Sequence, residues 1–168
     1  MKPEAKYAIF LFMAVVIFLT LISNIAGTVV VYPPPPGLKT SPDFTLKAND
    51  IPVWVERIGS KMKTFSYSLY SGREMEDLNV ANFSCSGTVT LRITASTKIN
   101  SFMIRPKSLN ITAAVNGNEL IFSIAGPQKL YIEINGSPHL ALFANPLEVK
   151  PPKKGDRDVI YFGPGIYT

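Results

Sequence analysis

The residue types that most often carry chemistry are scarce in this 168-residue chain, which has one histidine and one cysteine. A serine–histidine–aspartate nucleophile would depend on His139 alone, which follows a predicted turn. A zinc site needs three or four nitrogen or sulfur ligands, so His139 and Cys85 do not make a metal centre. Cys85 is expected to be a small buried side chain, with pairing to another chain as the alternative. The sequence therefore predicts no catalytic residue, no metal and no cofactor.

Two groups of charged residues resemble sites but are better explained as surface. Asp156 and Asp158 lie two residues apart, yet three cations accompany them in the loop 151–158, which predicts a solvated linker. The triplet 105–107, Arg-Pro-Lys, has the order of an Arg-x-Lys pair, and this order is interpreted as chance.

The net charge of +5 is a mild basic excess. The basic clusters would attract an anionic polysaccharide or lipid head groups, although solvated surface is the default interpretation. No nucleic-acid-binding module is recognisable, so no nucleic-acid partner is expected.

Direct contact with carbohydrate is predicted from aromatic residues and from acceptor triplets. Trp54 and Tyr70 fall out of phase with the apolar faces of their strands, so either could stack on a sugar ring; packing against a neighbouring domain or linker is the preferred alternative. Three Asn-x-Ser/Thr triplets make Asn82, Asn110 and Asn135 candidates for glycosylation in an exported protein.

The N-terminal residues predict a membrane-directed segment. Residues 7–25 are almost wholly apolar, and together with 26–31 they exceed the roughly 20 helical residues that span a bilayer. Lys2 and Lys6 precede the run and no cation follows before Lys39, which places the N-terminus in the cytoplasm and the rest outside. A retained anchor over residues 7–31 and a cleaved signal peptide both fit this orientation.

The rest of the chain predicts a spacer and one β domain. Four consecutive prolines at 33–36 favour an extended polyproline rod, so residues 32–42 are assigned as a spacer. From residue 43 the period is that of strands, as at 65–70, 89–95 and 130–134, and Asn116-Gly117 predicts a hairpin. About seven or eight short strands separated by turns predict an all-β, antiparallel, Ig-like β-sandwich over residues 43–149, preceded by the one N-terminal helix.

The order of these strands carries a family resemblance. The segments in question are 53–57, 65–67, 84–93, 104–106, 130–136, Phe143-Ala144-Asn145-Pro146 and Tyr161-Phe162-Gly163-Pro164-Gly165. In this order, residues 43–168 resemble the N-terminal β-sandwich and the start of the right-handed parallel β-helix of polygalacturonase-like and dextranase-like glycoside hydrolases, families 28 and 49. The resemblance implies that residues 150–168 are a linker and the first strand of a β-helix missing from this chain.

Two functions follow, from different classes. The resemblance implies a non-catalytic accessory domain of an exported or membrane-anchored polysaccharide-degrading protein, because the paired aspartates that family 28 hydrolases use as acid and base are absent. Its partners would be the β-helix in cis, the membrane and a polysaccharide. The alternative is a stand-alone, membrane-anchored extracytoplasmic β-sandwich for adhesion or partner binding. The first predicts that Val159, Ile160 and Phe162 are left out of the domain's own sheets.

Overall fold

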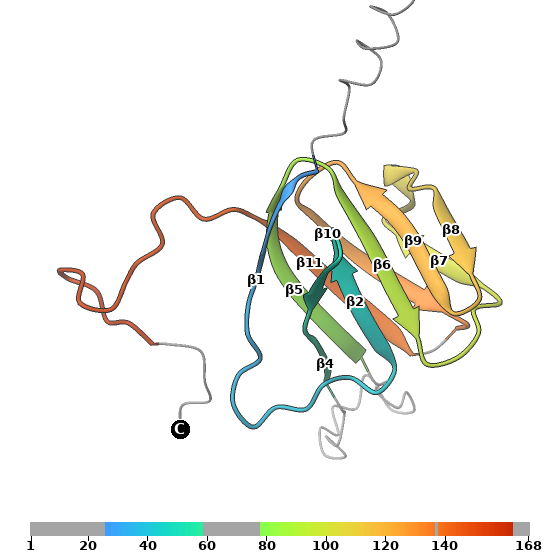
Figure 1. Ribbon diagram of the computed structural model, residues 1–168, viewed down its shortest axis with the longest axis horizontal. Helices are drawn as coiled ribbons and strands as arrows, with labels where there is room; N and C mark the ends of the chain where they lie inside the picture. Colours follow the sequence, from blue (N-terminus) through green and yellow to red (C-terminus); the bar gives the residue numbers. More distant parts are fainter. Residues whose placement is uncertain (1–25, 59–77, 137, 163–168) are drawn as a thin grey trace, which may run out of the picture.

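The computed structural model describes residues 26–58, 78–136 and 138–162, and these fold into two β-sheets packed face to face (Figure 1). The predicted N-terminal helix, over residues 7–25, and Tyr70 lie outside the described residues. Among the residues that are described, no helix is long and apolar enough to cross a membrane.

Eleven strands are found in the described parts of the chain, more than the seven or eight expected. One sheet has the order β1-β5-β11-β10-β7, with β4 also paired to β5, and the other has the order β3-β2-β6-β9-β8. A single turn of 3-10 helix, η1 (Lys107–Leu109), follows β7. The strands are β1 (Thr28–Val31), β2 (Phe44–Ala48), β3 (Ile51–Val53), β4 (Val55–Ile58), β5 (Leu78–Ser86), β6 (Val89–Ala95), β7 (Phe102–Arg105), β8 (Ala113–Asn116), β9 (Glu119–Ile124), β10 (Gln128–Ile134) and β11 (His139–Pro146).

The core lies between the sheets and follows the two-residue period of the strands. On β6, Val89, Leu91 and Ile93 are fully buried, while Thr90 between them faces solvent. The facing sheet contributes Phe83 from β5 and similar residues from β10 and β11. Complete burial of one such side chain contributes about 1.5–3 kcal/mol, so this alternation fixes which face of each strand points inward.

One strand pair departs from the antiparallel arrangement that was expected. β11 pairs with β10 in antiparallel fashion but with β5 in parallel, from His139↔Leu78 to Pro146↔Cys85. A parallel pair needs a long connection between its strands, and strands β6 to β10 supply it here. The first sheet is therefore mixed.

The sandwich also begins earlier than the sequence indicated. β1 pairs with β5 from Thr28↔Ser86 to Val31↔Phe83, and Val29 and Val31 pack against the core. The prolines at 33–36 therefore connect β1 to β2 within the domain and do not precede it.

Gly27 fixes the start of β1 against the turn between β5 and β6. Its N–H donates to the carbonyl oxygen of Thr88 at 2.6 Å, and its own carbonyl accepts from Nδ2 of Asn49 at 2.8 Å. A β-carbon at position 27 would collide with the carbonyl oxygen of Ser86. The chain is thus held to the sandwich from the first residues that the structure describes.

The C-terminal residues leave the sandwich after β11. Residues 147–162 contain no strand, and Ile160 is 85% exposed. Figure 1 shows this segment extending away from both sheets.

Candidate functional site

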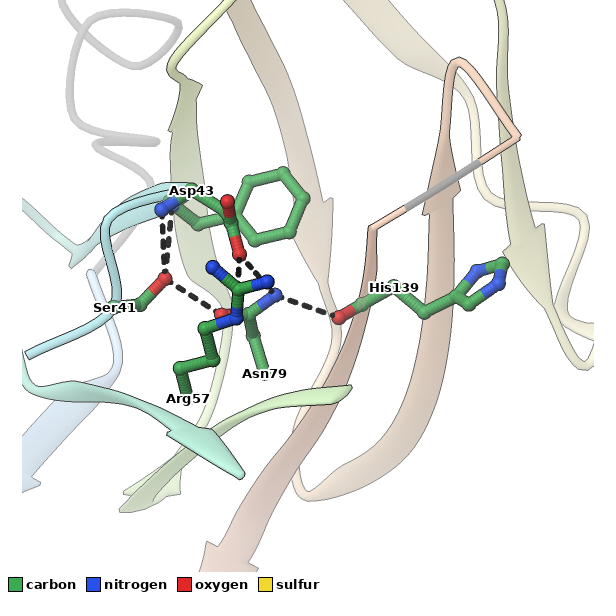
Figure 2. Close-up of polar contacts among 6 residues, drawn as sticks. Ser41, Asp43, Arg57, Asn79 and His139 are labelled. Carbon is green, nitrogen blue, oxygen red and sulfur yellow. Dashed lines mark hydrogen bonds and ion pairs between the residues drawn. The ribbon is translucent and has the colours of Figure 1, made fainter. Parts of the chain in front are cut away.

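A polar cluster, buried at Ser41 and Asn79 and open to solvent at Arg57, joins Ser41, Asp43, Arg57, Asn79 and the main chain of His139 (Figure 2). The hydroxyl of Ser41 donates to Oδ1 of Asn79 at 2.6 Å. Nδ2 of Asn79 donates to Oδ2 of Asp43 at 3.2 Å and to the carbonyl oxygen of His139 at 3.1 Å. Arg57 Nε lies 3.7 Å from the same Asp43 oxygen. The cluster ties the loop before β2 to β4, β5 and β11.

The cluster contains serine, aspartate and histidine, but it is not a nucleophilic triad. His139 takes part only through its carbonyl oxygen, and Figure 2 shows its imidazole directed away from Ser41 and Asp43. The ring instead stacks on Tyr131 with 5.2 Å between centroids. The hydroxyl of Ser41 also accepts the N–H groups of Asp43 and Phe44, the pattern of a serine turn. The cluster therefore has a structural role.

Cys85, Asp156 and Asp158, the other residues considered for chemistry, also have structural explanations. Cys85 is fully buried, and desolvation raises the pKa of its thiol, so it does not present a surface for pairing with another chain. Asp156 accepts the N–H of Lys153, and Asp158 lies 3.6 Å from Arg157 in a highly exposed loop. The described residues contain no group of three side chains able to hold a metal ion.

Trp54 lies where the chain passes from β3 in one sheet to β4 in the other. Its side chain is half-buried, and its indole Nε1 is buried with no hydrogen-bond partner among the described residues. Stacking on sugar remains a prediction for Trp54, as it does for Tyr70.

The three glycosylation candidates differ in the hydrogen bonds that their side-chain amides make. Asn135 Oδ1 accepts the N–H groups of Asn100 and Ser101, and its Nδ2 donates to the carbonyl oxygen of Lys98. Asn82 Oδ1 accepts from Asn145 at 2.6 Å. Asn110 is exposed, with a left-handed φ of 47°. Glycosylation at any of them stays a prediction.

A hollow of about 630 Å³ on the outer face of β7, β10 and β11 is the strongest binding candidate. Its size lies within the usual range for small-ligand sites. Tyr131 on β10 pairs with Ala141 on β11, whose methyl side chain leaves space, and Phe143 follows two residues along β11. Phe143 is 37% exposed. Both aromatic rings project outward because their neighbours Leu130 and Leu142 are buried in the core.

Three cations line the same hollow: Arg105 at the end of β7, Lys107 in η1 and Lys129 on β10. Arg105 pairs with Tyr131, and Lys129 with Phe143, in the strand register. Arg105 Nε is held by Glu133 Oε1 at 2.8 Å, which leaves the terminal guanidinium nitrogens for other partners. The Arg-Pro-Lys triplet, which the sequence analysis interprets as chance, thus lines this hollow.

The sequence did not reveal this hollow. Its aromatic and basic residues come from β7, η1 and the later pair β10 and β11, and the pairing of β7 with β10 brings these two parts of the chain together. The available signal was the triplet 105–107 itself.

A second hollow, of about 650 Å³, lies beside β8 and β9 and includes Asn110. Its lining is mostly aliphatic, with Leu109, Ile111 and Ile121 among the residues, and contains no charged side chain. It offers less chemistry than the outer-face hollow.

Comparisons with known proteins add little. No family model and no curated protein matches the chain. Among solved structures, Dex49A from Penicillium minioluteum is similar with a TM-score of 0.48 and 14% sequence identity, over 76% of this chain and 34% of that protein. The chain therefore corresponds to about a third of that protein's length. Neither a common family nor a common activity follows from similarity at this level.

Proposed function

We propose that this chain is the non-catalytic accessory domain of an extracytoplasmic polysaccharide-acting protein, and that it binds saccharide through the outer-face hollow. The observation that carries the proposal is the pair of outward aromatic rings next to the small Ala141: Tyr131 lies opposite it on β10, and Phe143 lies two residues along β11. The imidazole of His139 stacks on the Tyr131 ring, and Phe143 is the more exposed of the two aromatic residues. Aromatic rings offer a flat apolar surface against which the C–H face of a sugar can pack. The resemblance of residues 43–168 to the sandwich of polygalacturonase-like and dextranase-like proteins agrees with this role.

In this proposal the Ig-like sandwich acts in cis with a catalytic β-helix and holds it near its polymer. Residues 150–162 would lead toward that partner, in line with their exposure and lack of strand. The apolar N-terminal residues would anchor the protein with its N-terminus inside, or be cleaved on secretion. Because Thr28–Val31 is a strand of the sandwich, such an anchor would have to end before β1.

The test is retention of the full chain, in detergent micelles, on a panel of insoluble polysaccharides. We expect Phe143→Ala to reduce retention strongly on whichever polymer binds. Tyr161→Ala is the matched control, because Tyr161 is exposed but does not line the hollow. Absence of retention on every polymer, or equal loss with both variants, would contradict the proposal.

A stand-alone β-sandwich for adhesion or partner binding is the second candidate. It is favoured by the composition of the core, in which no described residue after Ala144 takes part. The two candidates differ in the size of the native gene product, which an antibody against residues 40–150 would measure. A product several times larger than 18.5 kDa supports the accessory role, and a product of this size supports the second candidate.

A further inference from the structure

The charges around the outer-face hollow indicate which kind of saccharide it takes. Every charged side chain lining it is a cation, namely Arg105, Lys107 and Lys129, and no carboxylate lines it among the described residues. Lysine and arginine only donate hydrogen bonds. A neutral sugar presents hydroxyl groups that both donate and accept, so a site for it normally supplies acceptors as well. Apart from the hydroxyl of Tyr131, which can also accept, the polar side chains of this lining only donate, so it suits a ligand that supplies hydrogen-bond acceptors.

We infer that the hollow binds an anionic sugar unit, a pyranose ring bearing a carboxylate or a sulfate, with the ring on Phe143 and Tyr131 and the anion among the three cations. This rests on the proposed saccharide-binding role and adds the chemical class of the ligand. The terminal guanidinium nitrogens of Arg105 can donate to two anion oxygens, because Nε already donates to Glu133, which orients the group. Lys107 and Lys129 supply two further donors from different elements.

The surroundings of the hollow favour a sugar over a nucleic acid. A single-stranded nucleic acid needs a basic groove that follows its backbone for several nucleotides. On the same outer face, β5 and β11 carry the amides Asn82 and Asn145, and β4 carries Glu56 paired with Val80. Toward β5 and β4 the basic surface therefore ends at the hollow, in agreement with a site for one anionic sugar unit.

The experiment is isothermal titration of the full chain, in detergent micelles, with three oligosaccharides: an oligogalacturonate, a sulfated heparin fragment and a neutral isomalto-oligosaccharide. We expect one or both anionic ligands to bind at least about tenfold more tightly than the neutral one, with affinity falling as salt is raised. The anionic ligand that binds more tightly identifies the group as carboxylate or sulfate.

Two double variants distinguish binding in the hollow from nonspecific attraction of an anion to the basic protein. Lys107→Gln combined with Lys129→Gln should weaken anionic binding about tenfold. Lys47→Gln combined with Lys98→Gln is the matched control, since it removes the same charge from exposed lysines outside the hollow and should leave affinity unchanged. A short single-stranded oligonucleotide is titrated in parallel.

The outcomes keep this inference apart from the proposed function. Equal binding of the neutral and anionic ligands, both lost in Phe143→Ala, overturns the inference and leaves the proposed function intact. Equal weakening by the two double variants shows charge attraction without a site and overturns the inference. Tighter binding of the oligonucleotide than of any saccharide also overturns it. Binding of no saccharide contradicts both the inference and the proposed function.

Discussion

The side chain of Asn79 connects three separate parts of the sandwich, namely the loop before β2, β5 and β11. It is fully buried and bonds Ser41, Asp43 and the carbonyl oxygen of His139. Asn79→Ala would leave these buried partners short of hydrogen bonds, which costs about 1–3 kcal/mol for an unsatisfied group. We expect a loss of about 2–3 kcal/mol in the free energy of unfolding, measured by urea denaturation.

The matched control is Asn116→Ala, because Asn116 is exposed at the end of β8 and makes no side-chain hydrogen bond with the described residues. Its effect should stay within about 0.5 kcal/mol. Equal effects of the two substitutions would show that the cluster does not stabilise the fold.

Cys85 offers a second prediction at the residue scale. Its burial raises the pKa of the thiol above the ordinary value of 9.0, so few molecules carry the reactive thiolate. Its contribution to stability is therefore fully present below that ordinary value and is lost as the pH rises through the raised pKa. We expect a thiol-specific disulfide reagent to react with the unfolded chain but only very slowly with the native one. Rapid reaction at neutral pH without denaturant would contradict this burial.

The sequons differ at the residue scale too. The side chain of Asn135 holds the loop at 98–101 through three hydrogen bonds, whereas no hydrogen bond of the Asn110 side chain is found among the described residues. In a eukaryotic secretory host we expect glycan occupancy at Asn110 to exceed that at Asn135. Enzymatic deglycosylation followed by peptide mass spectrometry measures both sites, and higher occupancy at Asn135 would refute the ranking.

At the scale of elements, the contribution of β1 to stability can be measured directly. Val29 and Val31 pack against the core, while Val30 points outward and is 44% exposed. A chain that begins at Tyr32 lacks this strand and should lose about 2 kcal/mol or more relative to one that begins at Ala26. Urea denaturation of the two chains measures the difference.

Point variants supply the control for that truncation. Val31→Thr places a hydroxyl toward the core and should cost about 1 kcal/mol or more. Val30→Thr makes the same change on the outer face and should stay within about 0.5 kcal/mol. Equal stability of all these forms would mean that β1 is only loosely attached to β5.

Strands and turns with a strong local sequence pattern could be predicted from the sequence. The alternation at 89–95 and 130–134 correctly predicted β6 and β10, because burial of one face imposes a two-residue period. The Asn116-Gly117 signal correctly placed a hairpin, but its two turn residues are Gly117 and Asn118, with positive φ at Gly117 only. This is the pattern of a type II′ turn, one residue later than an Asn-Gly type I′ turn.

What the sequence could not specify depends on pairings between distant residues. The sequence places residues 28–31 in the apolar N-terminal segment, because they continue it without a break in hydropathy, whereas the structure has them as strand β1. The parallel pairing of β11 with β5 brings together strands about sixty residues apart, and local periodicity carries no signal for it. The outer-face hollow depends on the same kind of pairing, between β7, β10 and β11.

At the scale of the whole molecule, the C-terminal segment distinguishes an accessory domain from a self-sufficient one. Val149 is 87% exposed, Ile160 is 85% exposed and Phe162 is 68% exposed, although the core of the sandwich needs none of them. Several exposed large apolar residues in one segment are typical of a contact with another protein or domain. In the accessory interpretation, residues 159–162 contact the β-helix in cis and lack that contact when studied alone.

This interpretation makes a measurable prediction about self-association. The full chain should associate in a concentration-dependent manner, whereas a chain ending at Val149 should associate less and keep its free energy of unfolding within about 0.5 kcal/mol. Sedimentation velocity in matched micelles measures the first property and urea denaturation the second. A quadruple change of Val159, Ile160, Tyr161 and Phe162 to serine should reproduce the shorter chain's behaviour if the apolar side chains are responsible. A large loss of stability on truncation would instead mean that the segment belongs to the domain's own fold, and it would contradict the accessory interpretation.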